Sequence, residues 1–144
     1  MPKGVCSYKY SMELYPLELH LYFNADMEDF LDRYDVIDAS GNRITARKNS
    51  KARKAFLNKA KCCSVITTGA VEKTTSKYAV CIIMDVIDIP VWAHEANHAA
   101  DFVCDFCGVR YGSFQTGEAN AYLVEWAMRK IVDSYFEMKG KEKL

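Results

Sequence analysis

The chain has 144 residues, of which 50% are hydrophobic and 26% charged, and its 19 basic and 19 acidic residues give a formal net charge of zero. This length suits one domain with a sizeable core, and the composition excludes a disordered chain. The zero charge argues against a chain that binds polyanions as a whole, and the absence of a long apolar run predicts no membrane span.

Residues 1–15 lack the apolar core of a secretory signal, so we expect a cytoplasmic protein. Proteins of that compartment keep their thiols reduced. The sequence therefore predicts free thiols rather than disulfides for its six cysteines, which are Cys6, Cys62, Cys63, Cys81, Cys104 and Cys107.

The first third of the chain predicts one strand and one helix. Residues 1–15 show no periodicity and predict irregular structure. From Leu17 to Phe23 apolar and polar residues alternate, which predicts a half-buried strand with His20 on its solvent side. Asp26 is a typical N-cap for a helix over residues 26–37. The turn at 39–42 then predicts a hairpin that continues as residues 43–45.

Residues 43–61 form a basic segment with no acidic residue. Its cations are Arg43, Arg47, Lys48, Lys51, Arg53, Lys54, Lys59 and Lys61. Such a run fits a nucleic-acid or acidic-partner surface, and it also fits the solvated face of a short helix with Ala55 and Phe56 inward. We favour the helix face because no recognition motif accompanies the charge.

Residues 63–71 and 77–84 are apolar and β-branched and flank a polar turn, so they predict an antiparallel hairpin. One of these strands could lie at the edge of a sheet and bind an extended peptide by strand addition. The same pattern also fits a plain core sheet under the next helix.

The segment 88–108 predicts the helix around which the chain is organised. Asp88 is a suitable N-cap, Pro90 suits the first turn, and Gly108 ends the run. One face is apolar at helical spacing and predicts packing on a sheet. Its members are Trp92, Ala96, Ala99, Val103 and Phe106.

The same helix carries His94, Glu95 and His98, an H-E-x-x-H pattern. Residues four apart share a helix face, so the two imidazoles can hold one Zn²⁺ between them. Glu95 would lie beside the metal, where it can take a proton from a bound water. The pattern predicts a zinc centre with Glu95 as general base.

A catalytic zinc usually takes three protein ligands, and we expect the third to be a carboxylate. Glu118 is the best candidate, at the start of a second helix over residues 116–139 that Thr116 or Ser113 would cap. Two antiparallel helices could bring Glu118 to the histidines. Asp101 is the alternative third ligand.

An H-E-x-x-H helix followed about 20 residues later by a helical Glu resembles the gluzincin branch of the zincin metallopeptidases, and especially the small stand-alone domains often encoded by phages. The resemblance covers roughly residues 80–130. It implies an α+β fold in which a small antiparallel or mixed sheet packs on the metal helix and a C-terminal helix. It also implies a single metallopeptidase domain over residues 1–144, and a host-cytoplasmic setting if a phage encodes it.

The chain departs from the best-known gluzincins at two places. Gly117 replaces an Asn before the ligand Glu, and Tyr122 replaces a carboxylate four residues after it. Orienting a histidine would then fall to Asp101 or Asp105. Tyr111 and Tyr122 are candidates for stabilising the oxyanion.

We therefore expect a zinc-dependent hydrolase that acts on a protein or peptide substrate, with one Zn²⁺ per chain. Two other classes stay open: a zinc-stabilised phage or host-interaction protein without turnover, and a nucleic-acid-associated protein that uses residues 43–61. Pairing the cysteines Cys104 and Cys107 in a structural zinc or redox site has weaker support than packing roles.

Overall fold

The structure is a computed structural model, and it describes the chain except for residues 1–5, 39, 46, 49, 86, 110–113 and 143–144. Side chains are not described at 6, 114–116 and 141–142. Within these limits the chain forms one mixed sheet of six strands with four helices, which confirms the predicted α+β class.

The sheet has the strand order β1-β2-β6-β5-β3-β4. The strands are β1 Cys6–Ser11, β2 Glu18–Phe23, β3 Tyr34–Ile37, β4 Arg43–Ile44, β5 Val65–Glu72 and β6 Tyr78–Met84. In this described sheet only β2 and β6 pair in parallel, and all other neighbours are antiparallel. The hairpin β5–β6 confirms the sequence prediction. The predicted turn at 39–42 also joins a hairpin, β3–β4, but its first strand was predicted as the end of a helix.

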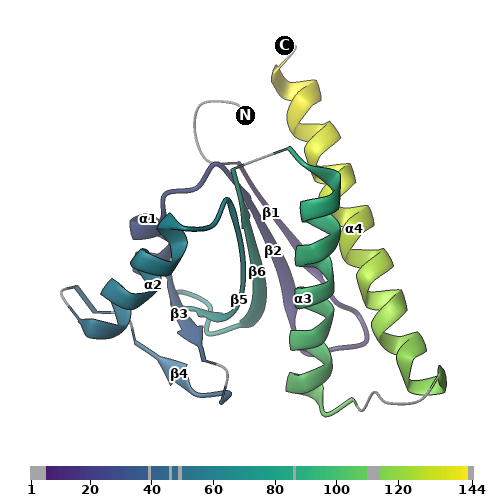
Figure 1. Cartoon of the computed structure of the whole chain (residues 1–144), viewed down its shortest axis with the longest axis horizontal. Coiled ribbons are helices and arrows are strands. Elements are labelled where there is room, and N and C mark those ends of the chain that lie inside the picture. Colours follow the sequence, from purple (N-terminus) through teal and green to yellow (C-terminus); the bar gives the residue numbers. More distant parts are fainter. Residues whose placement is uncertain are drawn as a thin grey trace.

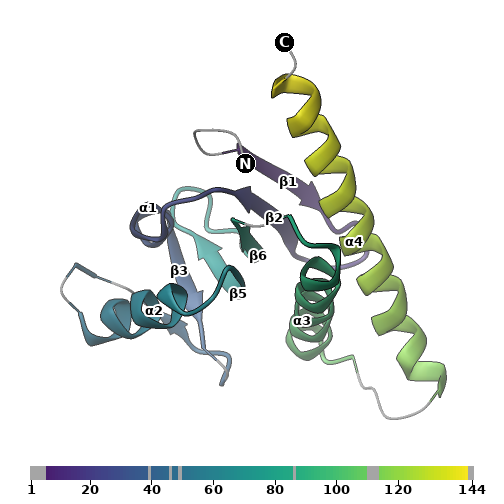
Figure 2. The same cartoon turned by 45° about the horizontal axis from the view of Figure 1, so that its top comes forward.

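Two helices cover each face of the sheet (Figure 1). The helices α1 Met27–Arg33 and α2 Lys51–Lys61 pack on one face, with Phe30 and Phe56 stacked between them. The other face carries α3 Ile89–Cys107 and the long α4 Phe114–Glu142. Figure 2 shows α3 and α4 side by side on that face, where α3 contacts β5 and β6 and α4 contacts β1 and β2.

The ends of α3 follow the predicted caps. The Asp88 side chain accepts a hydrogen bond from the Val91 N–H at 3.3 Å, and Gly108 ends the helix in the left-handed region with a φ of 70°. Glycine is favoured there because it has no Cβ. The apolar face of α3 is buried as predicted, except that Phe106 is 40% exposed.

α3 approaches the sheet closely over Gly69 of β5. A Cβ on Gly69 would lie 2.1 Å from two ring carbons of Phe102, so only glycine fits under this ring without a shift. The glycine therefore sets the distance between α3 and β5.

The structure corrects the sequence prediction in the first third of the chain. Residues 6–11 form β1 instead of irregular structure, and the helix at Asp26 ends at Arg33, after which Tyr34–Ile37 is a strand. The side chain of Tyr34 is fully buried, and its backbone pairs with Glu72 of β5. Sheet pairing therefore overrides the helical pattern there.

The prediction that β2 is half-buried is also wrong. His20 and Tyr22 face α1 and are 0% and 4% exposed, because β2 is an interior strand with helices on both sides. Polar side chains on this second face are paired with one another instead of with water.

The strands before α3 are interior strands and do not form the sheet edge that was considered for peptide addition. β6 lies between β2 and β5, and β5 lies between β6 and β3. The ends of the described sheet are β1 and β4. Strand addition would therefore have to use one of those two.

Among the described residues, no helix is long and apolar enough to cross a membrane. The cysteines whose side chains are described, at 62, 63, 81, 104 and 107, are all free thiols. Ala55 of α2 is exposed, whereas Phe56 packs inward as expected.

Candidate metal centre

His94 and His98 lie one turn apart on the exposed face of α3. Their Nε2 atoms are 3.0 Å apart, and their ring centroids are 4.6 Å apart with an angle of 82° between the planes. Two imidazoles on one tetrahedral zinc, with Zn–N distances of roughly 2.0–2.1 Å, would hold their nitrogens about 3.3 Å apart. The pair therefore fits two ligand positions of a zinc site with little movement.

Glu95 follows His94 on α3 but points toward the sheet, and it is 8% exposed. Its Oε2 accepts a hydrogen bond of 2.5 Å from the Thr67 hydroxyl, which also lies 3.3 Å from the Glu95 carbonyl oxygen. Thr67 belongs to β5, so the sheet holds this carboxylate in place.

The structure does not bring Glu118 together with the two histidines. Among the described residues, no group of three His, Cys, Asp or Glu side chains could hold a metal ion. Asn120, two residues after Glu118, is hydrogen-bonded to Asp101, three residues after His98. At this contact α4 therefore lies beside the part of α3 that follows the histidines.

Helix α4 begins at Phe114, so Thr116 lies within the helix and is not its N-cap. Ser113, the other candidate cap, lies outside the described residues, and so does Tyr111.

In the structure Asp101 and Tyr122 have surroundings that the sequence did not predict. The Asp101 Oδ1 accepts a hydrogen bond of 2.9 Å from the Asn120 amide, which ties α3 to α4. Tyr122 is 65% exposed and lines a groove between α4 and the β1–β2 loop. Asp105 is exposed on α3. The histidine pair is hydrogen-bonded within itself, through the two Nε2 atoms.

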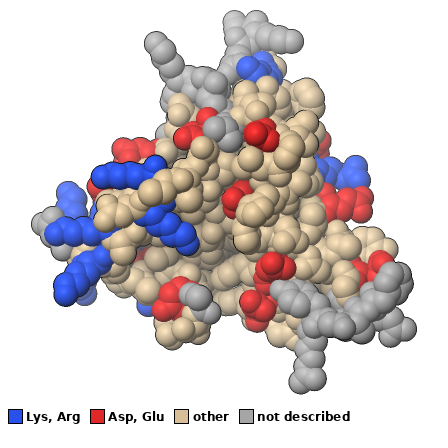
Figure 3. All heavy atoms as spheres, viewed as in Figure 1, with Lys and Arg blue, Asp and Glu red and all other residues tan. Residues whose placement is uncertain are grey.

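The basic segment is in part structural. Arg43 forms a 2.7 Å ion pair with Asp35, and Arg53 is buried against Glu28 and Asp32. Figure 3 shows Lys and Arg gathered on the side of α2 and β4. Lys51, Lys54 and Lys59 of α2 are among the exposed or half-exposed cations. This confirms the predicted short helix with a solvated basic face.

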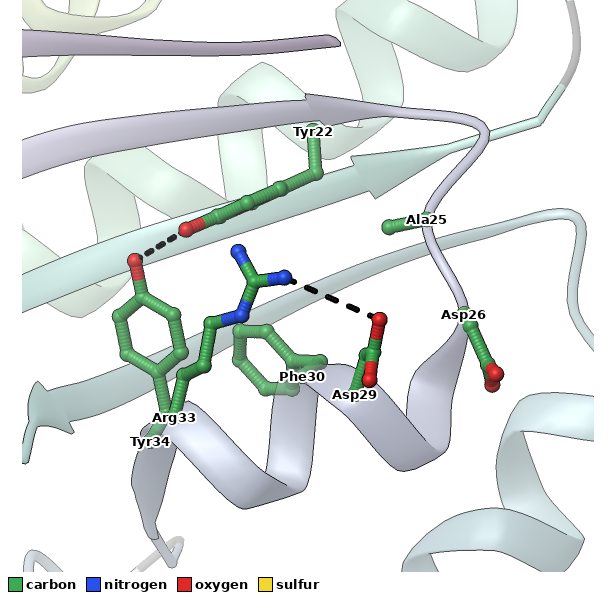
Figure 4. A pocket seen from close by; sticks show the side chains of 7 residues that line it. All are labelled: Tyr22, Ala25, Asp26, Asp29, Phe30, Arg33 and Tyr34. Atoms are coloured by element: carbon green, nitrogen blue, oxygen red, sulfur yellow. Dashed lines mark hydrogen bonds and ion pairs between the residues drawn. The ribbon is translucent and has the colours of Figure 1, made fainter. Parts of the chain in front are cut away.

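A second polar cluster lies inside the sheet face that α1 covers. His20 Nδ1 is 2.6 Å from the Tyr34 hydroxyl, and its Nε2 is 3.0 Å from Glu18. The Tyr34 hydroxyl also meets Tyr22 at 2.5 Å and donates to Glu72 at 3.2 Å. Figure 4 shows the two tyrosine hydroxyls turned toward each other.

Burial shifts the pKa values of two members of this cluster. It lowers the pKa of His20, although the hydrogen bond with Glu18 acts in the opposite direction. Burial also raises the pKa of Tyr34. The cavity beside the tyrosines is only about 10 Å³, which is room for about one water. The cavity beside the two tyrosines is therefore too small for a substrate.

Thr67 is the site residue that sequence reasoning missed. Val65, Thr67 and Gly69 alternate along β5 and face α3. A polar residue among the apolar residues of this face was the signal that could have indicated Thr67.

Comparisons with protein-family models, with curated proteins and with solved structures found no match.

Proposed function

We propose that the protein is a zinc-dependent peptidase whose metal is held by His94 and His98, with Glu95 as the general base. The observation that carries the proposal is the convergence of the two Nε2 atoms, 3.0 Å apart, on the exposed face of α3. Both imidazoles are open to solvent, so water and a peptide could reach them.

A zinc ion bound there would lower the pKa of its water toward neutrality and polarise a peptide carbonyl. Glu95 would accept a proton from the attacking water and pass it to the leaving amine. The Thr67 hydroxyl supports this role because its hydrogen bond fixes one oxygen of the Glu95 carboxylate.

For the third ligand we propose Glu118, with Asp101 as the alternative. Glu118 is exposed near the start of α4. To bind, its carboxylate would have to come closer to the two histidines than it lies in this structure. Asp101 is already on α3 but would have to exchange its hydrogen bond with Asn120.

Metal content and turnover test the proposal together. Purified wild-type protein and three variants, His94→Ala, Glu95→Gln and Glu118→Ala, are analysed for zinc and assayed on fluorescently labelled unfolded casein. Glu125→Ala is the matched control, because Glu125 is also an exposed carboxylate of α4. We expect one zinc per chain in the wild type and the control, and loss of zinc in His94→Ala.

Glu95→Gln should keep zinc and lose turnover by about 10²–10⁴-fold. Wild-type turnover in Glu95→Gln, or wild-type protein without zinc, would overturn the peptidase proposal. Zinc without turnover in the wild type would favour a zinc-stabilised interaction protein. Zinc retained in Glu118→Ala would transfer the third-ligand role to Asp101, Asp105 or a solvent molecule.

A further inference from the structure

β1 is an open sheet edge of useful length. In the described sheet β1 pairs only with β2, and it has six residues, whereas the opposite edge, β4, has two. Lys9 of β1 donates to Glu72 at 2.6 Å, so its charge is already paired within the chain.

A groove of about 790 Å³ lies between the end of β1, the β1–β2 loop and α4. Apolar and aromatic side chains form much of its lining, and Leu14 on the loop is 90% exposed. The volume is in the range of protein sites that take ligands. Its main apolar residues are Tyr10, Met12, Leu14, Tyr122, Leu123 and Trp126.

Lys130 places a positive charge in this groove. Its Nζ lies 4.9 Å from the ring centroid of Tyr10 and 5.8 Å from that of Trp126. No salt bridge joins Lys130 to an acidic side chain in the described structure, whereas Arg129, its neighbour, pairs with Glu125 at 2.9 Å. An acidic group of a partner would therefore find a cation there.

Glu13 on the loop limits how much negative charge the groove can accept, because it also lines the groove. Among the described side chains of the lining, Glu13 and Lys130 are the charges outside a salt bridge, and their signs are opposite. A tract of several acidic residues would be repelled at Glu13. The lining therefore favours a partner with one acidic group next to apolar side chains.

We propose that this groove and the edge of β1 bind an extended peptide segment of another protein by strand addition. The peptide backbone would pair with β1, an apolar side chain would pack against Leu123 and Trp126, and one carboxylate would reach Lys130. Such sites combine main-chain hydrogen bonds with pockets for alternate side chains. Neither His94 nor His98 lines the groove, so the site is a docking surface independent of the proposed hydrolysis.

The test begins with a displayed library of random heptapeptides that is selected on the whole wild-type protein. Enriched peptides are synthesised, and their affinities are measured by fluorescence anisotropy for wild type, Lys130→Glu and Trp126→Ala. Lys139→Glu is the matched control, because Lys139 also lies over an aromatic ring of α4, that of Tyr135 at 5.9 Å, but outside the groove. Circular dichroism confirms that each variant is folded.

We expect peptides with alternating apolar residues and one acidic residue, and at least about 10-fold weaker binding to Lys130→Glu with no change for Lys139→Glu. Replacing the acidic residue of the peptide by Lys should restore binding to Lys130→Glu. N-methylation should weaken binding at alternate peptide positions only, because one side of a strand faces β1.

Three results would overturn the proposal. One is the absence of enriched peptides, and another is binding that Lys130→Glu and Trp126→Ala leave unchanged. The third is a concentration-dependent dimer of the wild type that Leu14→Ser dissociates, since the groove would then be occupied by a second copy of the chain.

Discussion

Replacing Gly69 by alanine should destabilise the fold through a single contact. The added Cβ would lie 2.1 Å from the Phe102 ring, far inside van der Waals distance. Because β5 is an interior strand, the ring and α3 must move away. Overpacking of this kind costs about 1–3 kcal/mol in the free energy of unfolding, which urea denaturation measures.

The sign of the effect should reverse once the ring is absent. In a Phe102→Ala background the added methyl group has space, and alanine is better than glycine in a strand interior by about 0.5–1 kcal/mol. A double-mutant cycle should therefore give a coupling free energy of at least about 1.5 kcal/mol.

Gly140→Ala is the control, since nothing lies within 4 Å of a Cβ there. As Gly140 is in α4, this change should stabilise the protein slightly. If Gly69→Ala destabilised the wild type and the Phe102→Ala variant equally, contact with the Phe102 ring would not be the reason that glycine is required at position 69.

The remaining predictions concern charge and hydrogen bonding. Burial lowers the pKa of His20, so the unfolded chain takes up this proton first, and stability should fall as the pH drops below about 6.5. Urea titrations at several pH values should show that His20→Gln flattens this slope, by at most about 1.4 kcal/mol per pH unit. Arg53→Ala should cost about 1 kcal/mol or more because the buried guanidinium joins α2 to Glu28, whereas Lys54→Ala on the exposed face should stay within about 0.5 kcal/mol. Thr67→Val should keep the zinc content and lower the proposed turnover by about 10-fold, and Thr67→Ser should restore it; equal turnover in both would remove Thr67 from the site.

The helix around the H-E-x-x-H pattern could be predicted well because its signals are local. The cap at Asp88, the left-handed end at Gly108 and the apolar face at helical spacing all belong to one continuous segment. The hairpin β5–β6 could be predicted equally well, since a short polar turn joins two apolar segments. Such patterns depend on neighbours in the sequence.

The errors come from long-range pairing. The alternating polarity of β2 predicts a surface position for His20, but Tyr34 of β3 supplies a buried partner for its ring. Tyr34 itself continues the helical pattern of α1, and only its pairing with Glu72 of β5 makes it a strand residue. No local pattern carries that information.

One part of the candidate site could also be predicted from local sequence, whereas another part could not. The approach of His94 and His98 follows from their spacing on one helix and could be predicted. The position of Glu118 depends on how far α4 slides along α3, which the Asn120–Asp101 hydrogen bond helps to set. The separation of Glu118 from His98 along the chain does not determine that height.

The parallel pairing of β2 with β6 also has a consequence for the order of folding. Leu19 lies beside Val80, which comes much later in the chain, so the centre of the sheet requires the closure of a long loop before it gains any contact. The strands of the sheet all precede α3 in the described chain. A chain that has been synthesised only as far as Met84 therefore has its strands but an uncovered apolar face at Leu19, Leu21 and Ile82. Such an intermediate should aggregate until α3 and α4 cover it, so chaperone dependence should be highest at that stage of synthesis.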